Sequence, residues 1–361
     1  MARPDARQLW RRATESKLFL PLMLLAFILL IDSILVPGFF SIQARGVNLY
    51  GSLIDILRNA STIMLLAIGM TLVIATGGID LSVGAVMAIA ASVAALLMNP
   101  YVLAKELPPN LMRLINDPNF TFQPLWVVIA VTLLVAVLCG LWNGMLVAYV
   151  RIQPMVATLI LMIAGRGIAQ LITNGVRIQI FYEPYAYIGQ GWAILPFSLY
   201  LVAIVYALTW LLTRRTAIGM FIESVGINAR ASFFSGISEK RIKMLAYVIC
   251  ALCAGLAGLV ASANVKTSDA NNIGLTDELD AILAVVIGGT VLGAGGRFSL
   301  LGSLLGAIVM QAVPTSMYAL GVPAVALQAI MGMAVIVFIL LYSEQAQSFL
   351  RNLGTKTEAG P

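Results

Sequence analysis

Ten long apolar segments limit what this chain can fold into. They lie at about 18–38, 60–76, 83–99, 125–149, 154–173, 194–213, 243–263, 280–296, 299–318 and 325–343. A helix needs roughly 20 apolar residues to cross a bilayer. With 60% hydrophobic and 11% charged residues, the chain is far more apolar than a soluble domain. The sequence therefore predicts an all-α polytopic membrane protein of about ten transmembrane helices. The segment 280–296 is the weakest of them, because it ends in GGTVLGAGG.

The positive charges predict the orientation of these segments. If the N-terminus lies inside, fifteen of the 22 Lys and Arg residues are cytoplasmic, six are external, and Arg166 lies within the fifth segment. Cytoplasmic loops carry such an excess, so both termini are expected in the cytoplasm. The predicted divisions are a cytoplasmic N-terminal segment, 1–17, without a cleavable signal peptide, a membrane domain, 18–343, and a cytoplasmic tail, 344–361. The net charge of +6 then reflects topology and anionic lipid rather than nucleic acid.

One apolar run is interrupted by turn-forming residues and a carboxylate. Residues 72–84 read LVIATGGIDLSVG, with Gly77 and Gly78 just before Asp80. Paired glycines permit a helix break, and a charge in a membrane segment lines a cavity, forms a pair or lies at such a break. Asp80 therefore either lines a pathway or caps the third segment, with Ser82 sharing the cap. The element favours a protein that moves a polar solute across a membrane.

Two more polar residues lie inside apolar segments. Arg166, between two glycines in AGRGIAQ, either has a direct role or forms an ion pair with Asp32, Asp80 or Asp280. Asn143, in GLWNG, is expected to form an interhelical hydrogen bond. The candidate pathway residues are Asp80, Ser82, Asn143, Arg166 and Asp280.

Glycine patterns recur along the chain. The stretches 72–85 and 284–297 both place paired Gly within an apolar run, at corresponding positions of the two halves. Such interrupted segments are typical of inverted repeats around a solute pathway, although so short a match can also arise by chance. The G-x-x-x-G pairs at 140/144 and 302/306, and the small residues at 254–258, predict helix packing within one bundle rather than a subunit interface.

Two polar segments stand out. The longest cytoplasmic loop, 214–243, is expected to hold one or two short helices, with Asn228 as an N-cap. The segment 268–280, SDANNIGLTDELD, is expected on the outer face. It is interpreted either as a contact for a partner protein or solute, or as a solvated loop that caps a helix. The contact residues would be Asn271, Asn272, Asp277 and Glu278.

Several chemistries are excluded or disfavoured. The chain has no His, and its C-x-x-C, Cys250 to Cys253, lies in an apolar run, where small core residues are expected. No cofactor or metal site is predicted. No G-x-x-x-x-G-K-[ST] motif is present, so the chain is not expected to hydrolyse ATP. An ion gradient or a separate subunit must drive transport, and the scarcity of intramembrane carboxylates favours a subunit that docks on 214–243.

Four stretches together resemble the permease subunits of bacterial sugar ABC importers of the ribose, xylose and galactose type. They are LAIGMTLVIATGGIDLSVGAV (66–86), GLWNGMLVAYVRIQPMVATLILMIAGRGIAQ (140–170), GMFIESVGINARASFFSGI (219–237) and ELDAILAVVIGGTVLGAGGRFSLLGSLLGA (278–307). Within this family the likeness is greatest to the galactofuranose permeases. Glu223, Ser224 and Ile227 depart from the general family pattern, which weakens a sugar assignment from that pattern and favours the galactofuranose branch.

The resemblance implies a permease in the bacterial inner membrane with three kinds of protein partner. A periplasmic binding protein would deliver the sugar, a second permease would complete the pathway as a homodimer or heterodimer, and cytoplasmic ATPase subunits would act through a coupling helix at about 228–236. The implied coupling residues are Glu223, Gly226, Asn228, Arg230, Phe233, Phe234 and Gly236. The rival interpretations are an ion-driven secondary carrier, a membrane enzyme acting on lipid-linked sugar through the 277–280 acids, and a passive channel.

Overall fold

The computed structural model describes residues 18–342, apart from 47, 100–116, 118–120 and 293–294. Its helices are α2 (Phe19–Leu35), α3 (Ser52–Ala75), α4 (Val83–Met98), α6 (Leu125–Ala148), α7 (Pro154–Thr173), α8 (Glu183–Gln190), α9 (Phe197–Arg215), α10 (Ile218–Ile227), α11 (Ala229–Phe234), α12 (Glu239–Val265), α13 (Asp277–Ile287), α14 (Leu300–Ala319) and α15 (Ala324–Tyr342). The predicted terminal segments 1–17 and 344–361 lie outside the described residues.

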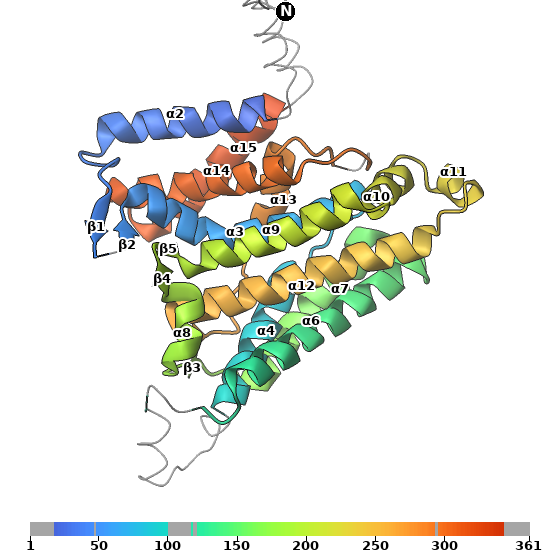
Figure 1. Cartoon of the computed structure of the whole chain (residues 1–361), viewed down its shortest axis with the longest axis horizontal. Helices are drawn as coiled ribbons and strands as arrows, with labels where there is room; N and C mark the ends of the chain where they lie inside the picture. Colours follow the sequence, from blue (N-terminus) through green and yellow to red (C-terminus); the bar gives the residue numbers. More distant parts are fainter. Residues whose placement is uncertain (1–17, 47, 100–116, 118–120, 293–294, 343–361) are drawn as a thin grey trace, which may run out of the picture.

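Three short antiparallel strand pairs accompany the helices. They are β1 (Gln43–Arg45) with β2 (Asn48–Tyr50), β3 (Ile178–Gln179) with β6 (Thr267–Ser268), and β4 (Trp192–Ala193) with β5 (Leu195–Pro196). Figure 1 shows the long helices side by side, with α10 and α11 at one end and α8 and the strands at the other. These are called the α10–α11 end and the strand end below.

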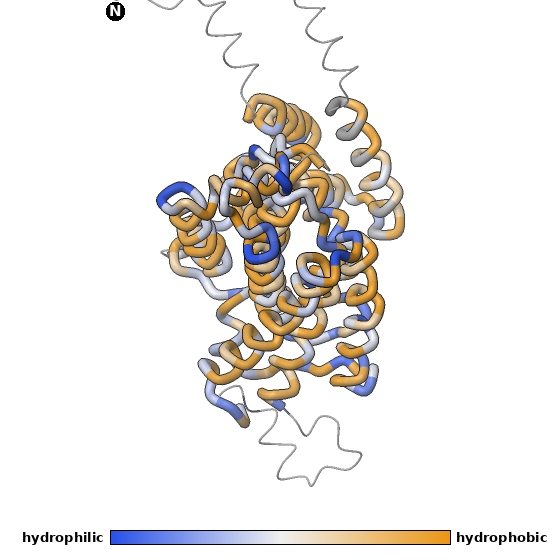
Figure 2. Tube along the Cα trace, turned by 90° about the vertical axis from the view of Figure 1, so that its right-hand side faces the viewer, coloured by the Kyte–Doolittle hydropathy of each residue, from blue (hydrophilic) through white to orange (hydrophobic). Residues whose placement is uncertain are grey.

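Each of the ten predicted apolar segments contains a helix. Six of them, α3, α6, α7, α9, α12 and α14, are long and apolar enough to cross a membrane by length and composition. The segment predicted to be weakest forms α13, which has only 11 residues and ends where the paired glycines begin. Figure 2, which looks along the helices from the α10–α11 end, shows mostly apolar helix sides with hydrophilic residues gathered in the turns. The mostly helical, polytopic prediction is confirmed.

The core is built around α3 and α12. In their most apolar windows, α3 is 78% buried and α12 61%, against 22% for both α6 and α9. Helix α12 packs on α3, α4 and α6, and α14 packs on α3 and α13. The outer helices leave apolar faces uncovered because lipid, rather than water, surrounds such segments.

The small-residue pairs pack helices within this one chain. Gly140 of α6 lies against the α12 backbone at Tyr247 and Val248, and Gly306 of α14 lies against Ala284 of α13. The predicted interhelical packing is confirmed. Cys250 and Cys253 are free and buried, as expected for core residues.

Candidate functional site

Two helix breaks occur at the paired glycines. Helix α3 ends at Ala75 and α4 begins at Val83, while α13 ends at Ile287 and α14 begins at Leu300. Gly77 and Gly289 each have a φ of 82°, in the left-handed region that glycine adopts without steric cost. The sequence echo therefore marks two real interruptions of helices.

A buried polar network stabilises the first break. Asp80 is only 1% exposed, and its Oδ1 accepts hydrogen bonds from the Ser82 backbone N–H at 2.9 Å and the Ser82 hydroxyl at 2.7 Å. Asn143 of α6 donates its amide to the Ser82 hydroxyl at 2.7 Å and to Asp80 Oδ1 at 3.4 Å. The interhelical hydrogen bond expected of Asn143 is confirmed.

The capping prediction is only half right. Ser82 is the residue before α4, but its side chain makes no capping hydrogen bond, because its hydroxyl donates to Asp80 instead. Asp80 accepts the Ser82 N–H ahead of the helix, and the dipole of α4 favours a carboxylate there. The Leu81 N–H donates to the Thr158 hydroxyl of α7 at 3.1 Å, so the break is also attached to a helix that sequence reasoning did not connect with it.

Two buried polar atoms near this break have no hydrogen-bond partner among the described residues. They are Oδ1 of Asn143 and the hydroxyl of Tyr247. Tyr247 of α12 is fully buried, and its hydroxyl lies close enough to Gly78 that a Cβ there would be 2.6 Å away. Buried polar atoms without partners are uncommon and require a reason.

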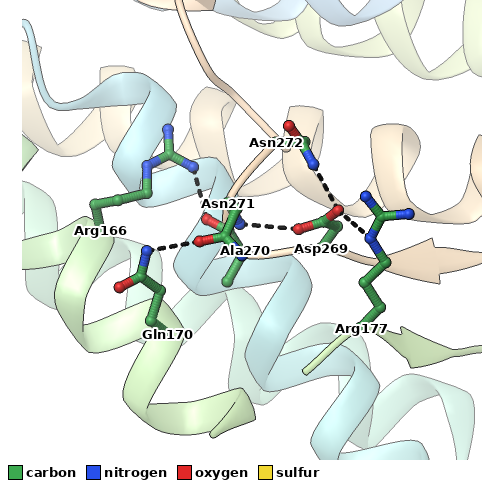
Figure 3. A network of polar contacts seen from close by, with 7 residues as sticks. All are labelled: Arg166, Gln170, Arg177, Asp269, Ala270, Asn271 and Asn272. Atoms are coloured by element: carbon green, nitrogen blue, oxygen red, sulfur yellow. Dashed lines mark hydrogen bonds and ion pairs between the residues drawn. The ribbon is translucent and has the colours of Figure 1, made fainter. Parts of the chain in front are cut away.

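Arg166 holds a loop rather than a carboxylate. Its guanidinium donates to the backbone carbonyls of Ala270, Ile273 and Gly274, at 3.0, 2.5 and 3.1 Å, and Figure 3 shows this side chain reaching the loop from α7. The proposed ion pair with Asp32, Asp80 or Asp280 is wrong. A guanidinium has five N–H donors, which backbone carbonyls can accept. Because every residue has a backbone carbonyl, such acceptors cannot be recognised from the sequence.

Neither Asp32 nor Asp280 pairs with Arg166 in the part of the chain that the structure describes. Asp32 of α2 is buried and accepts the Ser316 hydroxyl of α14 at 2.6 Å. Asp280 is only half-buried, on the same helix as Leu279, which is 52% exposed. The structure therefore brings Asp80, Ser82 and Asn143 together, and it places Arg166 and Asp280 away from them.

Side chains from α7 and the segment after it fasten the same loop. Gln170, one turn beyond Arg166, donates to the Asn271 side chain at 2.7 Å. Arg177 lies 2.6 Å from Asp269, which also accepts the Asn271 backbone N–H and the Asn272 side chain (Figure 3). Residues 269–274 are called the clasped loop below. The i, i+4 spacing of Arg166 and Gln170 could have indicated Gln170 from the sequence.

The surroundings of Asp269 in the clasped loop lower the pKa of its carboxyl group. Partial burial acts to raise the pKa of Asp269, but the hydrogen bonds from Asn272 and Asn271 and the charge of Arg177 outweigh it, so the pKa lies below its ordinary value. Asp269 is therefore a carboxylate at neutral pH. It organises the loop around two exposed amides.

Beyond the loop, α13 begins with three acids in its first turn, Asp277, Glu278 and Asp280, where the helix dipole favours them. Its N-terminus meets that of α4. A Cβ at Gly84 would lie 2.1 Å from the Gly274 carbonyl oxygen and 2.4 Å from Oε2 of Glu278, so the two backbones are in direct contact. Glu278 is only 5% exposed, and in this conformation it does not reach the surface predicted to contact a partner.

The polar segment 214–243, predicted to hold one or two short helices, contains two, α10 and α11. Asn228 caps α11 by accepting the Ala231 N–H at 3.0 Å, as expected. Phe233 and Phe234 are 69% and 87% exposed, and Gly236, at a φ of 82°, turns the chain after them. Phe233 and Phe234 are neighbours and form an exposed aromatic pair outside the long apolar helices.

A shallow, open hollow of about 320 Å³ lies beside α10. Its lining residues are Arg214, Glu223, Arg297, Phe298 and Ser299. Arg214 lies 6.0 Å from the Phe298 ring centre. Glu223 therefore faces the segment before α14, while Arg230 lies on the exposed side of α11.

Comparison with known proteins identifies the family of this chain. Residues 52–340 match the family described as the branched-chain amino acid transport system permease component. The chain belongs to this family. It is 44% identical to the galactofuranose transporter permease protein YtfT of Escherichia coli K12, over 93% of this chain and 92% of the relative. No solved structure matches it.

More distant relatives carry other sugars. The chain is 38% identical to the fructose import permease protein FruF of Bifidobacterium longum, over 86% of this chain and 82% of that one. It is 33% identical to the ribose import permease protein RbsC of Escherichia coli K12, over 83% and 86%. The chain is thus the multi-pass, non-catalytic permease component of an ABC importer, and the resemblance drawn from its motifs is confirmed.

Proposed function

We propose that this permease carries a monosaccharide across the bacterial inner membrane, with a galactofuranose-like sugar favoured. The observation that carries the proposal is the 44% identity to the galactofuranose permease along 93% of the chain. Similarity to ribose and fructose permeases supports the wider class of monosaccharides. In such an importer the binding protein contributes much of the sugar choice.

The α10–α11 end faces the cytoplasm and the strand end faces outward, with ten membrane segments and both termini inside. The excess of Lys and Arg on the cytoplasmic side supports this orientation. The breaks after α3 and α13 are the corresponding parts of an inverted repeat. Single cysteines replacing Phe234 and Asn271, in a protein whose Cys139, Cys250 and Cys253 are replaced by Ala, would test this topology. An impermeant thiol reagent should label only Asn271→Cys in intact cells.

The sugar passes the first break. Sugar hydroxyls both donate and accept hydrogen bonds, and the break offers both functions in Asp80, Ser82 and Asn143. The unpartnered Asn143 Oδ1 and Tyr247 hydroxyl add capacity that a passing hydroxyl could use, although both are buried in this conformation. Arg166 and Asp280 act further along the pathway, Arg166 by holding the clasped loop.

Each protein partner has its own surface. Phe233 and Phe234, at the exposed tip of α11, enter a groove of the ATPase, with Arg230 at its rim. Asn271 and Asn272, on the clasped loop, contact the binding protein, and Asp277 adjoins them. A second permease, the same or related, completes the pathway.

Affinity purification from native membranes in mild detergent, followed by mass spectrometry, tests this assignment. We expect an ATPase with a Walker motif to co-purify, with or without a second permease. Recovery of this chain alone, under conditions that preserve a known transporter complex, would favour an ion-driven carrier. Competition of labelled uptake by galactofuranose, ribose and fructose would then rank the sugars.

A further inference from the structure

The last turn of α10 contacts two distant parts of the membrane core at one point. A Cβ on Gly226 would lie 1.9 Å from the carbonyl oxygen of Ala75 and 2.4 Å from the backbone nitrogen of Gly296. That nitrogen donates to the same Ala75 oxygen at 2.8 Å. A Cβ on Gly295 would lie 2.5 Å from the Gly226 oxygen. Three backbone segments therefore meet without a side chain between them.

This contact lies beside both helix breaks. Ala75 is the last residue of α3, just before the first break, and Gly296 lies four residues before α14. About one turn before Ala75, the Thr71 hydroxyl of α3 donates to the hydroxyl of Ser303, in the first turn of α14, at 2.7 Å. The ends of α3 and α14 are thus joined to each other as well as to α10.

The contact is also close to the exposed tip. Helix α10 ends at Ile227 and α11 begins at Ala229, with only Asn228 between them. The Asn228 N–H donates to the Ser224 oxygen of α10 at 3.0 Å. Because packed backbone has low compressibility, a displacement of α11 reaches Ala75 and Gly296 without being absorbed by a flexible side chain.

We propose that Gly226, Gly295, Gly296 and the Ala75 carbonyl form a junction that positions α3 and α14 together in response to α11. The proposal rests on the function proposed above, because it requires an ATPase that moves α11. Under it, these residues touch neither sugar nor ATP and act by positioning. A Cβ on Gly226 or Gly295 would push the backbone segments apart, and Gly296 has a φ of 92°, which favours glycine.

The test uses the complete complex in proteoliposomes, with ATPase and binding protein, and measures sugar transported per ATP hydrolysed. We expect Gly226→Ala to lower this ratio about tenfold while ATP hydrolysis stays within about twofold of wild type. Gly189→Ala is the matched control, because its Cβ would collide almost as closely, 2.3 Å from the Asn264 nitrogen, but between α8 and α12 at the strand end. Its ratio should stay at the wild-type value.

Three results would overturn the junction: an unchanged ratio in Gly226→Ala, a parallel fall of transport and hydrolysis, or an equal fall of the ratio in Gly189→Ala. The wild-type measurement decides the proposed function separately, since absence of ATP-driven uptake there contradicts that function.

If Gly226→Ala does not assemble, hydrogen exchange of the unaltered complex tests the junction instead. With a non-hydrolysable ATP analogue, we expect peptides covering 223–228, 74–80 and 295–302 to change protection together. A change in 223–228 alone would contradict the junction.

Discussion

The clasped loop and the glycine junction hold the protein together in opposite ways. At the loop, the side chains of Arg166, Gln170 and Arg177 bind backbone carbonyls, the Asn271 side chain and the Asp269 carboxylate, respectively. At the junction, Gly226, Gly295 and Gly296 bring backbone against backbone. Individual side-chain hydrogen bonds contribute only about 0.5–1.5 kcal/mol net and can exchange with water. A loop held in this way can open, whereas a junction without side chains transmits displacement.

The largest effect should come from removing the proposed contact between α11 and the ATPase, which moves the junction. In Phe233→Ser/Phe234→Ser, two apolar contacts of about 1.5–3 kcal/mol each are lost, enough to lower ATP-driven uptake about a hundredfold. Membrane insertion, measured by surface labelling and yield, should be unchanged. Met220→Ser is the control, because Met220 of α10 is also an exposed apolar residue, at 61%. Unchanged uptake in the double variant would contradict the role of α11.

Loss of the clasp should have the next largest effect. Arg166→Ala removes the donors of three carbonyls, and the loss of about 1.4 kcal/mol of loop positioning corresponds to a tenfold fall in uptake. Arg166→Lys should rescue little, because an ammonium lacks the guanidinium's planar fork of donors. Gln170→Ala, which loses one exposed bond, should fall by less than Arg166→Ala. If Arg166→Lys transports like wild type, uptake does not depend on the hydrogen bonds from the guanidinium to the three carbonyls.

The first break should respond mainly in stability. In Asp80→Ala, the Ser82 N–H and hydroxyl and the Asn143 amide lose an acceptor, and each unsatisfied buried group costs about 1–3 kcal/mol. Thermal unfolding in detergent should show a lower midpoint for this variant, and a smaller change for Asp80→Asn, which keeps Oδ1. Ser92→Ala, at a buried hydroxyl without a partner, should leave the midpoint unchanged. Equal midpoints for Asp80→Ala and wild type would contradict the claim that this network stabilises the first break.

The smallest effect concerns pH at the clasped loop. Because the folded pKa of Asp269 lies below its ordinary value of about 3.9, its contribution is complete above that value and is lost as pH falls through the folded pKa. Hydrogen exchange of 269–274 should therefore be constant from pH 7 to 5, after correction for intrinsic rates, and should rise below about pH 4. Asp269→Asn should show no such step. A step near pH 6 would assign the effect to another group.

The sequence was informative where residue type alone limits the structure. Apolar length located ten of the described helices, paired glycines located both breaks, and Asn228 marked the start of α11. It failed where the partner is backbone. The Arg166 acceptors are carbonyls of Ala270, Ile273 and Gly274, which any residue type supplies, so pairing with an acid was the natural but wrong expectation.

The junction could not be found from sequence for a related reason. Its members, at 75, 226, 295 and 296, come from three separate parts of the chain. The family resemblance implied a coupling role for Gly226, but nothing in the sequence connected it with Ala75, Gly295 or Gly296. The chain reversals at the two breaks bring them together. Local patterns identify where a helix stops, but not which distant backbone lies against its end.

Uptake of labelled sugar into proteoliposomes containing the purified complex tests the transport assignment most directly. ATP inside the vesicles, binding protein outside and a protonophore can each be added or omitted. We expect uptake to require ATP and binding protein and to persist with the protonophore. Uptake without ATP that the protonophore abolishes would contradict the importer and identify an ion-driven carrier.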